Sequence, residues 1–228
     1  MKINKFSEIG KHHIETGKEN QDALCFDENE KVCVISLADG VSTCSESKKG
    51  AEIACATITD FFMKMGEELL GFNEKNIANF IVSRIMYELK KYADENSKNV
   101  EDYSSTIASI MIDKRSNKML CFSLGDSLVG TVKEGNYSVV IPPSDSTDGC
   151  YVTTTRGAAD EAKIKVTNVG VTESLFICSD GAWKKMYERN KINEDICRII
   201  ENKDYYSLEK YLKKEDNFDD LSFISVDI

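Results

Sequence analysis

Two apolar stretches of the sequence end in the same way, at an Asp-Gly pair. Residues 32–38 carry no charged side chain and stop at Asp39-Gly40, and residues 175–178 are followed closely by Asp180-Gly181. Uninterrupted apolar runs of this length are typical of β-strands that are buried on both faces. A single Asp-Gly ending is explained by turn chemistry alone. Because the ending occurs twice, it indicates that two buried strands present carboxylates to a common site.

The rest of the sequence alternates between strand-like and helix-like patterns. Runs rich in β-branched and aromatic residues, bounded by polar turns, predict strands at 23–26, 31–38, 106–114, 119–125, 128–141, 163–169, 174–180 and 221–228. Apolar residues at helical spacing predict helices at 49–65, 77–89, 192–200 and 205–212.

Residues 142–162 fit an irregular active-site flap. Hairpins interrupted by helices predict an α+β fold of antiparallel sheets covered by helices. With two prolines and no low-complexity linker, we expect a single domain over residues 1–228.

Charge and cysteine usage narrow the class of protein. The formal net charge of −10 argues against binding to nucleic acid or to an anionic membrane. The eight cysteines contain no CxxC pair, and several lie inside apolar runs, which is typical of reduced core cysteines and predicts a cytoplasmic location. No stretch approaches the roughly 20 apolar residues of a membrane span, and the first residues lack the apolar segment of a signal peptide.

Acidic residues lie beside the predicted strands throughout the chain, at Asp22, Asp39, Asp126, Asp180 and Asp219. An antiparallel sandwich can gather such strand ends at one edge. Clustered carboxylates repel one another, so they need a cation to compensate their charge. Oxygen ligands without nearby histidine or thiolate favour magnesium or manganese over zinc. The glycine at position 40 leaves its backbone carbonyl open to an ion.

An ordered series of short motifs spans nearly the whole chain: "GKENQDA", "ISLADGVS", "SSTIAS", "SLGDS", "FICSDGAW" and "DDLSFISV". In this order and spacing the sequence resembles the metal-dependent protein phosphatases of type 2C. The resemblance implies a four-layer αββα sandwich, with two antiparallel sheets flanked by helices. It also implies a centre of two Mn or Mg ions and hydrolysis of phosphoserine or phosphothreonine in a phosphoprotein, with a serine/threonine kinase as the natural counterpart.

The resemblance also assigns roles to particular residues. Asp39 would bridge the two metal ions, and the carbonyl of Gly40 would hold one of them. Asp180 and Asp219 would ligate the first ion, and Asp22 would act through metal-bound waters. A water bridging the ions would then attack phosphorus, so no side-chain nucleophile is needed.

Two further positions follow from the same resemblance. Asp126 matches a position linked to a third, weaker metal ion in bacterial relatives. The stretch "DNFDDLS" allows two registers, one based on Asp216 and one on Asp219. We prefer Asp219, because that register keeps the hydroxyl of Ser222 before the apolar strand.

The sequence departs from the family where substrate phosphate binds. Most members carry an arginine shortly before the Asn-Glu/Gln-Asp motif, and the stretch before Asp22 contains none. Lys18 and His13 are the candidates to replace it, although lysine offers a point charge rather than a bidentate fork. Arg156 in the flap is a third candidate. These features are similar to those of a divergent bacterial branch of the family.

Two other functions remain open from the sequence. Cys150 and Arg156 fit the C-x5-R spacing of thiolate phosphatases, but the intervening valine and threonines favour extended chain over a phosphate cradle. A type 2C-like fold could also serve as a non-catalytic binding module.

His12 and His13 would point in opposite directions on a strand, which argues against a shared ligand role. Trp183 fits a packing position better than a substrate platform.

Overall fold

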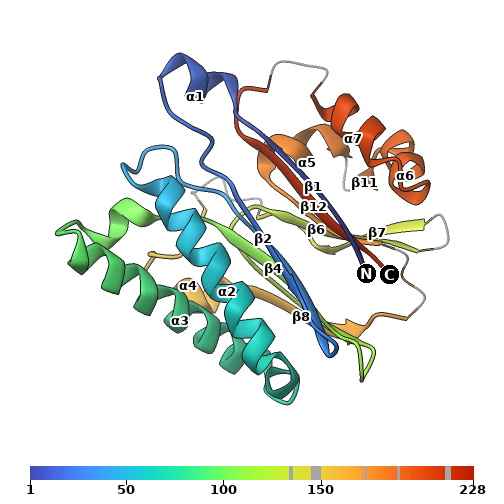
Figure 1. Cartoon of the computed structure of the whole chain (residues 1–228), viewed down its shortest axis with the longest axis horizontal. Helices are drawn as coiled ribbons and strands as arrows, with labels where there is room; N and C mark the ends of the chain where they lie inside the picture. Colours follow the sequence, from blue (N-terminus) through green and yellow to red (C-terminus); the bar gives the residue numbers. More distant parts are fainter. Residues whose placement is uncertain (134–135, 145–149, 171, 173, 189–190, 214–216) are drawn as a thin grey trace.

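The computed structural model (Figure 1) describes residues 1–133, 136–144, 150–170, 172, 174–188, 191–213 and 217–228. Two five-stranded antiparallel sheets face each other, and helices cover the outer face of each sheet (Figure 1). The predicted α+β fold with a four-layer αββα sandwich is therefore confirmed.

The two sheets combine strands from distant parts of the sequence. The first sheet has the order β2 (Ala23–Glu28), β3 (Val32–Ala38), β4 (Ile107–Asp113), β5 (Lys118–Leu124) and β8 (Lys163–Asn168). The second has the order β1 (Lys2–Glu8), β12 (Leu221–Asp227), β9 (Ser174–Cys178), β6 (Leu128–Lys133) and β7 (Asn136–Ile141). Because β1 pairs with β12 along its whole length, the two ends of the chain lie side by side (Figure 1).

Helices form the two outer layers. The long helices α2 (Ser47–Leu69) and α3 (Glu74–Glu95) cover the first sheet, and α5 (Asp180–Met186), α6 (Glu194–Glu201) and α7 (Tyr205–Leu212) cover the second (Figure 1). The connections contain the short helices α1 (Lys11–Glu15), η1 (Val100–Tyr103) and α4 (Ala158–Glu161), and a ribbon of β10 (Tyr187–Glu188) and β11 (Lys191–Ile192). None of the described helices is both long and apolar enough to cross a membrane.

The apolar run of β3 is explained by its position between two hydrophobic layers. Cys33, Ile35 and Leu37 pack into the layer between the two sheets. Val32 and Val34 belong to the layer between the first sheet and its helices. A third layer lies between the second sheet and α5, α6 and α7. Both faces of β3 are therefore buried, so its pattern does not alternate.

Some local predictions differ from the structure. His12 and His13 lie on α1 and not on a strand; this helix has five residues, too few to show a period in the sequence. The predicted strand 128–141 is a hairpin of β6 and β7, with residues 134–135 outside the described part. The flap 142–162 contains α4, and its residues 145–149 are likewise outside the described part.

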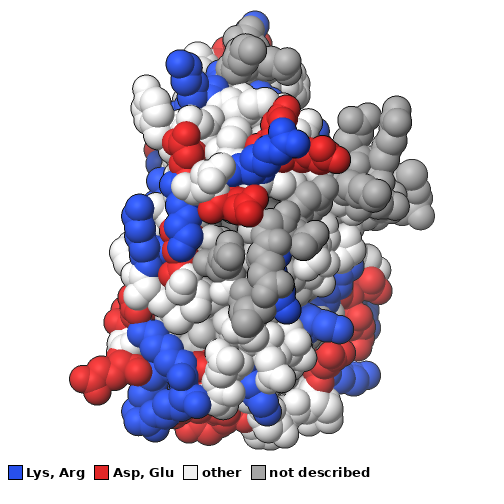
Figure 2. Space-filling view, turned by 90° about the vertical axis from the view of Figure 1, so that its right-hand side faces the viewer, with Lys and Arg blue, Asp and Glu red and all other residues white. Residues whose placement is uncertain are grey.

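The surface carries charges of both signs. On the face shown in Figure 2, lysine and arginine side chains alternate with aspartate and glutamate over much of the visible area.

Candidate active site

Strand register brings the predicted acidic residues to one end of the sandwich. Ala23 of β2 pairs with Ala38 of β3, so Asp22 and Asp39 are neighbours at the edge of the first sheet. In the second sheet, Cys178 of β9 pairs with both Leu128 and Phe223. Three segments therefore meet around the end of β9. They are the β5–β6 turn, which carries Asp126, the start of α5, which carries Asp180, and the segment before β12, which carries Asp219.

The electrostatics show that these carboxylates interact across the two sheets. Burial raises the pKa of Asp39 well above its ordinary value, and the charges of Asp22, Asp180, Asp126 and Asp219 raise it further. Burial likewise raises the pKa values of Asp126 and Asp219, and in both cases the charge of Asp180 adds to the effect. The five carboxylates therefore interact electrostatically at one end of the sandwich.

The carboxylate of Asp22 is buried near two serine hydroxyls. Burial raises its pKa to about 7, against the lowering effect of the Ser222 and Ser179 hydroxyls. Those hydroxyls donate to other acceptors, Ser222 to Ser7 and Ser179 to the Asp220 carbonyl. Within the described part of the chain, neither carboxylate oxygen of Asp22 has a hydrogen-bond partner.

Asp180 begins α5 and is 8 % exposed. Its Oδ2 accepts a hydrogen bond from Lys184 Nζ at 2.6 Å, and its buried Oδ1 has no partner among the described residues. The following glycine is required by close approach: a Cβ on Gly181 would lie 2.2 Å from the Asp220 carbonyl oxygen. The second Asp-Gly pair therefore lets α5 start directly against the segment that leads into β12.

The first Asp-Gly pair is held by the neighbouring backbone. The carbonyl of Asp39 accepts the N–H of Thr106 at 2.8 Å, and the N–H of Gly40 donates to the Gln21 carbonyl at 3.2 Å. A Cβ on Gly40 would lie 2.8 Å from backbone atoms of Ser47, at the start of α2. Glycine therefore allows the end of β3 to pass close to this helix.

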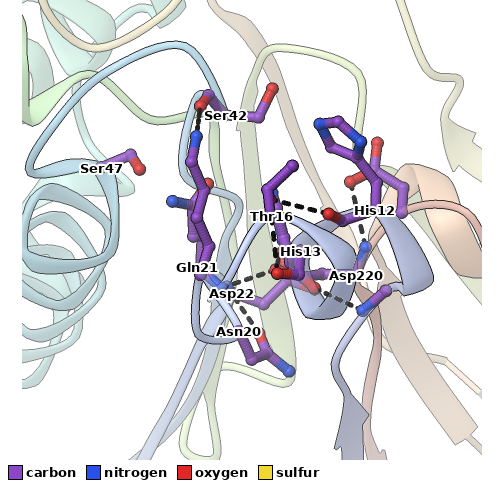
Figure 3. Close-up of polar contacts among 12 residues, drawn as sticks. His12, His13, Thr16, Asn20, Gln21, Asp22, Ser42, Ser47 and Asp220 are labelled. Carbon is purple, nitrogen blue, oxygen red and sulfur yellow. Dashed lines mark hydrogen bonds and ion pairs between the residues drawn. The ribbon is translucent and has the colours of Figure 1, made fainter.

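The two adjacent aspartates before β12 have different surroundings. Asp219 is half-buried and faces the carboxylate group described above. Asp220 is 1 % exposed and accepts the backbone N–H groups of Gly10 at 2.7 Å and Gln21 at 2.6 Å. Its Oδ2 also lies 2.9 Å from Nδ1 of His13 (Figure 3). Asp219, the residue of the preferred register, stays a prediction as a metal ligand, and Asp216 lies outside the described residues.

The three predicted phosphate-binding residues differ in their exposure to solvent. His13 is 2 % exposed and held against Asp220, so it is not available to a substrate. Lys18 is exposed, and its Nζ donates to the carbonyl of Ser42, just after the first Asp-Gly pair. It lines a cavity of about 640 Å³ together with Cys44 and Lys48. Arg156 is exposed beside α4.

The flap segment around Cys150 does not form a phosphate cradle. The N–H groups of Val152 and Thr153 donate to Thr155 Oγ1 and to the Ser105 carbonyl, so they are not free for a phosphate. Burial raises the pKa of the Cys150 thiol to about 12, and the charges of Asp126, Asp39 and Asp180 contribute. A reactive thiolate is therefore disfavoured at this position.

Two residues that the sequence analysis did not single out belong to the site. Lys184 pairs with Asp180 at i, i+4, a spacing that charge patterning on a helix could have revealed. The buried role of Asp220 has no separate signal in the sequence. Trp183 lies half-buried, and its indole N–H donates to the Asp126 carbonyl at 2.7 Å, so it has the packing role expected for it.

The donor chemistry of the site fits hard divalent cations. It offers carboxylate and carbonyl oxygens, and three buried carboxylate oxygens of Asp22 and Asp180 have no partner in the described structure. As the side chains stand, no three His, Cys, Asp or Glu side chains in the described ranges are close enough to hold one ion. Binding an ion therefore requires some of these side chains to move.

Comparisons with known proteins agree with this fold. A family model described as protein phosphatase 2C matches residues 9–215, which include Asp22, Asp39, Asp126 and Asp180 and end before Asp219. A bacterial serine phosphatase structure superposes with a TM-score of 0.73 at 14% identity, covering 100% of this chain and 98% of that one. The serine/threonine phosphatase of Staphylococcus aureus gives 0.72 at 15% identity, over 99% and 94%. That of S. agalactiae gives 0.66 at 20% identity, over 100% and 99%. No curated protein matches the sequence.

Proposed function

Because the chain belongs to the protein phosphatase 2C family, and is by class a protein serine/threonine phosphatase, we propose that it hydrolyses phosphoserine and phosphothreonine with the help of divalent metal ions. The single observation that supports metal dependence best is the group of five acidic residues at one end of the sandwich. Burial and neighbouring carboxylates raise the pKa values of Asp22 and Asp39, and buried carboxylate oxygens of Asp22 and Asp180 have no partner among the described residues, which indicates a site that lacks positive charge.

In this proposal each acidic residue has a defined role. Asp39 would help to hold both Mn²⁺ or Mg²⁺ ions, and the Gly40 carbonyl would help to hold one of them. Asp180 and Asp219 would hold the first ion, and Asp22 would act through water bound to it. Such ions would supply Lewis-acid chemistry, which activates water and neutralises charge on the phosphoryl oxygens.

Asp126 belongs to the same group of acidic residues and is the candidate ligand of a third metal ion. Its backbone is held by Trp183, and its carboxylate interacts electrostatically with Asp180. A third, weaker ion would bind at this place, beside the ion pair of Lys184 and Asp180.

Substrate phosphate binds beside the loop that follows Gly40. Lys18 is the side chain that carries this role best, because it is exposed and already contacts the Ser42 carbonyl of that loop. Arg156 contributes from the flap. The substrate is a phosphoprotein in the cytoplasm, and a serine/threonine kinase is the natural opposing enzyme.

An assay with p-nitrophenyl phosphate tests this function against its alternatives. We expect turnover that requires Mn²⁺, disappears with EDTA, survives in Cys150→Ser and is lost in Asp39→Asn. Metal-independent turnover that is lost in Cys150→Ser would instead indicate the thiolate mechanism. If the protein is folded by circular dichroism but shows no turnover with or without Mn²⁺, the non-catalytic binding module is the remaining function.

A further inference from the structure

Lys184 is a cation built into the acidic site. It lies one helical turn after Asp180 on α5, and its Nζ is 2.6 Å from Asp180 Oδ2. The other oxygen of that carboxylate, Oδ1, stays buried and unpartnered within the described residues. Asp180 can therefore keep Lys184 on one oxygen while it offers the other to an ion.

The same helix also holds Asp126 near Lys184. Trp183 donates its indole N–H to the Asp126 carbonyl at 2.7 Å, and the Lys184 ammonium lies 6.0 Å from the centre of the Trp183 ring. The ammonium lies 2.6 Å from Asp180 Oδ2, and it also interacts electrostatically with the carboxylates of Asp219 and Asp126. Lys184 therefore places one positive charge beside these three carboxylates.

Resting on the proposed function, we propose that the Lys184 ammonium takes the place of a third divalent ion at the Asp126–Asp180 part of the site. A lysine supplies a compact charge and three donors, which suits it to replace an ion between carboxylates. The site would then contain two exchangeable divalent ions and one covalently attached cation, the Lys184 ammonium. Lys184 acts as a positioning residue, because it orients Asp180 and excludes a further ion.

The experiment counts bound Mn²⁺ by equilibrium dialysis against the free metal, using the full chain. We expect two ions for the unchanged protein and three for Lys184→Asp, in which a carboxylate replaces the ammonium. Lys64→Asp is the matched control, because Lys64 forms an i, i+4 pair with Asp60 on α2 at 2.7 Å, away from the site. It should bind two ions.

Lys184→Gln separates charge from positioning, because glutamine still donates a hydrogen bond but carries no charge. Removal of one positive charge near a divalent ion should tighten binding of the weakest ion by about tenfold. The Lys184 side chain is 58 % exposed, so both variants should fold, which circular dichroism checks.

The outcomes are distinguishable. Two ions in both the unchanged protein and Lys184→Asp, or three ions in the unchanged protein, would overturn the inference and leave the proposed function standing. No bound Mn²⁺ in the unchanged protein would overturn the proposed function, and the inference with it.

Discussion

The imidazole Nδ1 of His13 lies 2.9 Å from Oδ2 of Asp220, and both side chains are almost fully buried. Asp220 also accepts the backbone N–H groups of Gly10 and Gln21, so it ties α1 and the start of β2 to the start of β12. Its neighbour Asp219 instead faces the acidic group around Asp180. Two adjacent aspartates thus have different roles: Asp220 holds the structure together, and Asp219 belongs to the proposed metal site.

This division predicts opposite effects for the same substitution at the two positions. Asp220→Asn should lower the free energy of unfolding by about 3 kcal/mol, because it breaks a buried charged network. Asp219→Asn should leave stability equal or higher in EDTA, because it removes a repelling charge, and should lower Mn²⁺-dependent turnover at least about 100-fold. Urea unfolding and the p-nitrophenyl phosphate assay measure the two effects. Equal loss of stability in both variants would contradict the assignment.

The raised pKa values predict how the metal-free protein responds to pH. Asp22 titrates at about 7 in the folded protein and near 3.8 in the unfolded chain, so the folded state holds a proton that the unfolded state loses in between. Its contribution to stability is therefore present below pH 3.8 and is lost as pH rises from about 4 to about 7. Asp39 acts in the same direction.

Urea midpoints in EDTA across this pH range measure the effect. Asp22→Asn cannot titrate, so its midpoint should fall less steeply than that of the unchanged protein. Added Mn²⁺ should raise the midpoint most at the high-pH end, where the carboxylates are charged and available to it. Parallel curves for the two proteins would show that Asp22 ionises as easily in the folded state as in the unfolded chain.

The sequence was most informative where both faces of an element are buried. The runs that became β3 and β9 lie between two hydrophobic layers, so their apolar pattern and their Asp-Gly ends were visible directly. The sequence pattern does not predict β1, because this strand lies at the edge of its sheet, pairs only with β12, and has residues that are partly or fully exposed. The tasks of His13 and Asp220 depend on a contact over more than 200 positions, which no local pattern records.

Substrate binding through Lys18 predicts a selective kinetic change. Lys18→Ala should raise KM for a phosphopeptide by about fivefold and change kcat little, because it removes a point charge at the phosphate site rather than a metal ligand. Lys118→Ala is the matched control, since Lys118 begins β5 at the end far from Leu124 and the acidic site. If Lys18→Ala left KM unchanged while Arg156→Ala raised it, the phosphate would bind from the flap alone.

The close approach at Gly181 predicts that the second Asp-Gly pair is needed for the position of α5. A Cβ there would lie 2.2 Å from the Asp220 carbonyl oxygen, and a backbone atom cannot move aside as a flexible side chain would. Gly181→Ala should therefore lower the free energy of unfolding by about 2–3 kcal/mol and displace Asp180 from its neighbours.

Gly71→Ala, just after α2, is the control for this change. Its Cβ would meet only the Glu68 carbonyl at 3.4 Å, an ordinary contact, so stability should change by less than about 0.5 kcal/mol. Urea unfolding compares the two variants, and Mn²⁺ dialysis reports whether Asp180 still reaches an ion. If Gly181→Ala were as stable as Gly71→Ala and bound Mn²⁺ normally, the start of α5 would have room to shift, and the glycine would serve the turn alone.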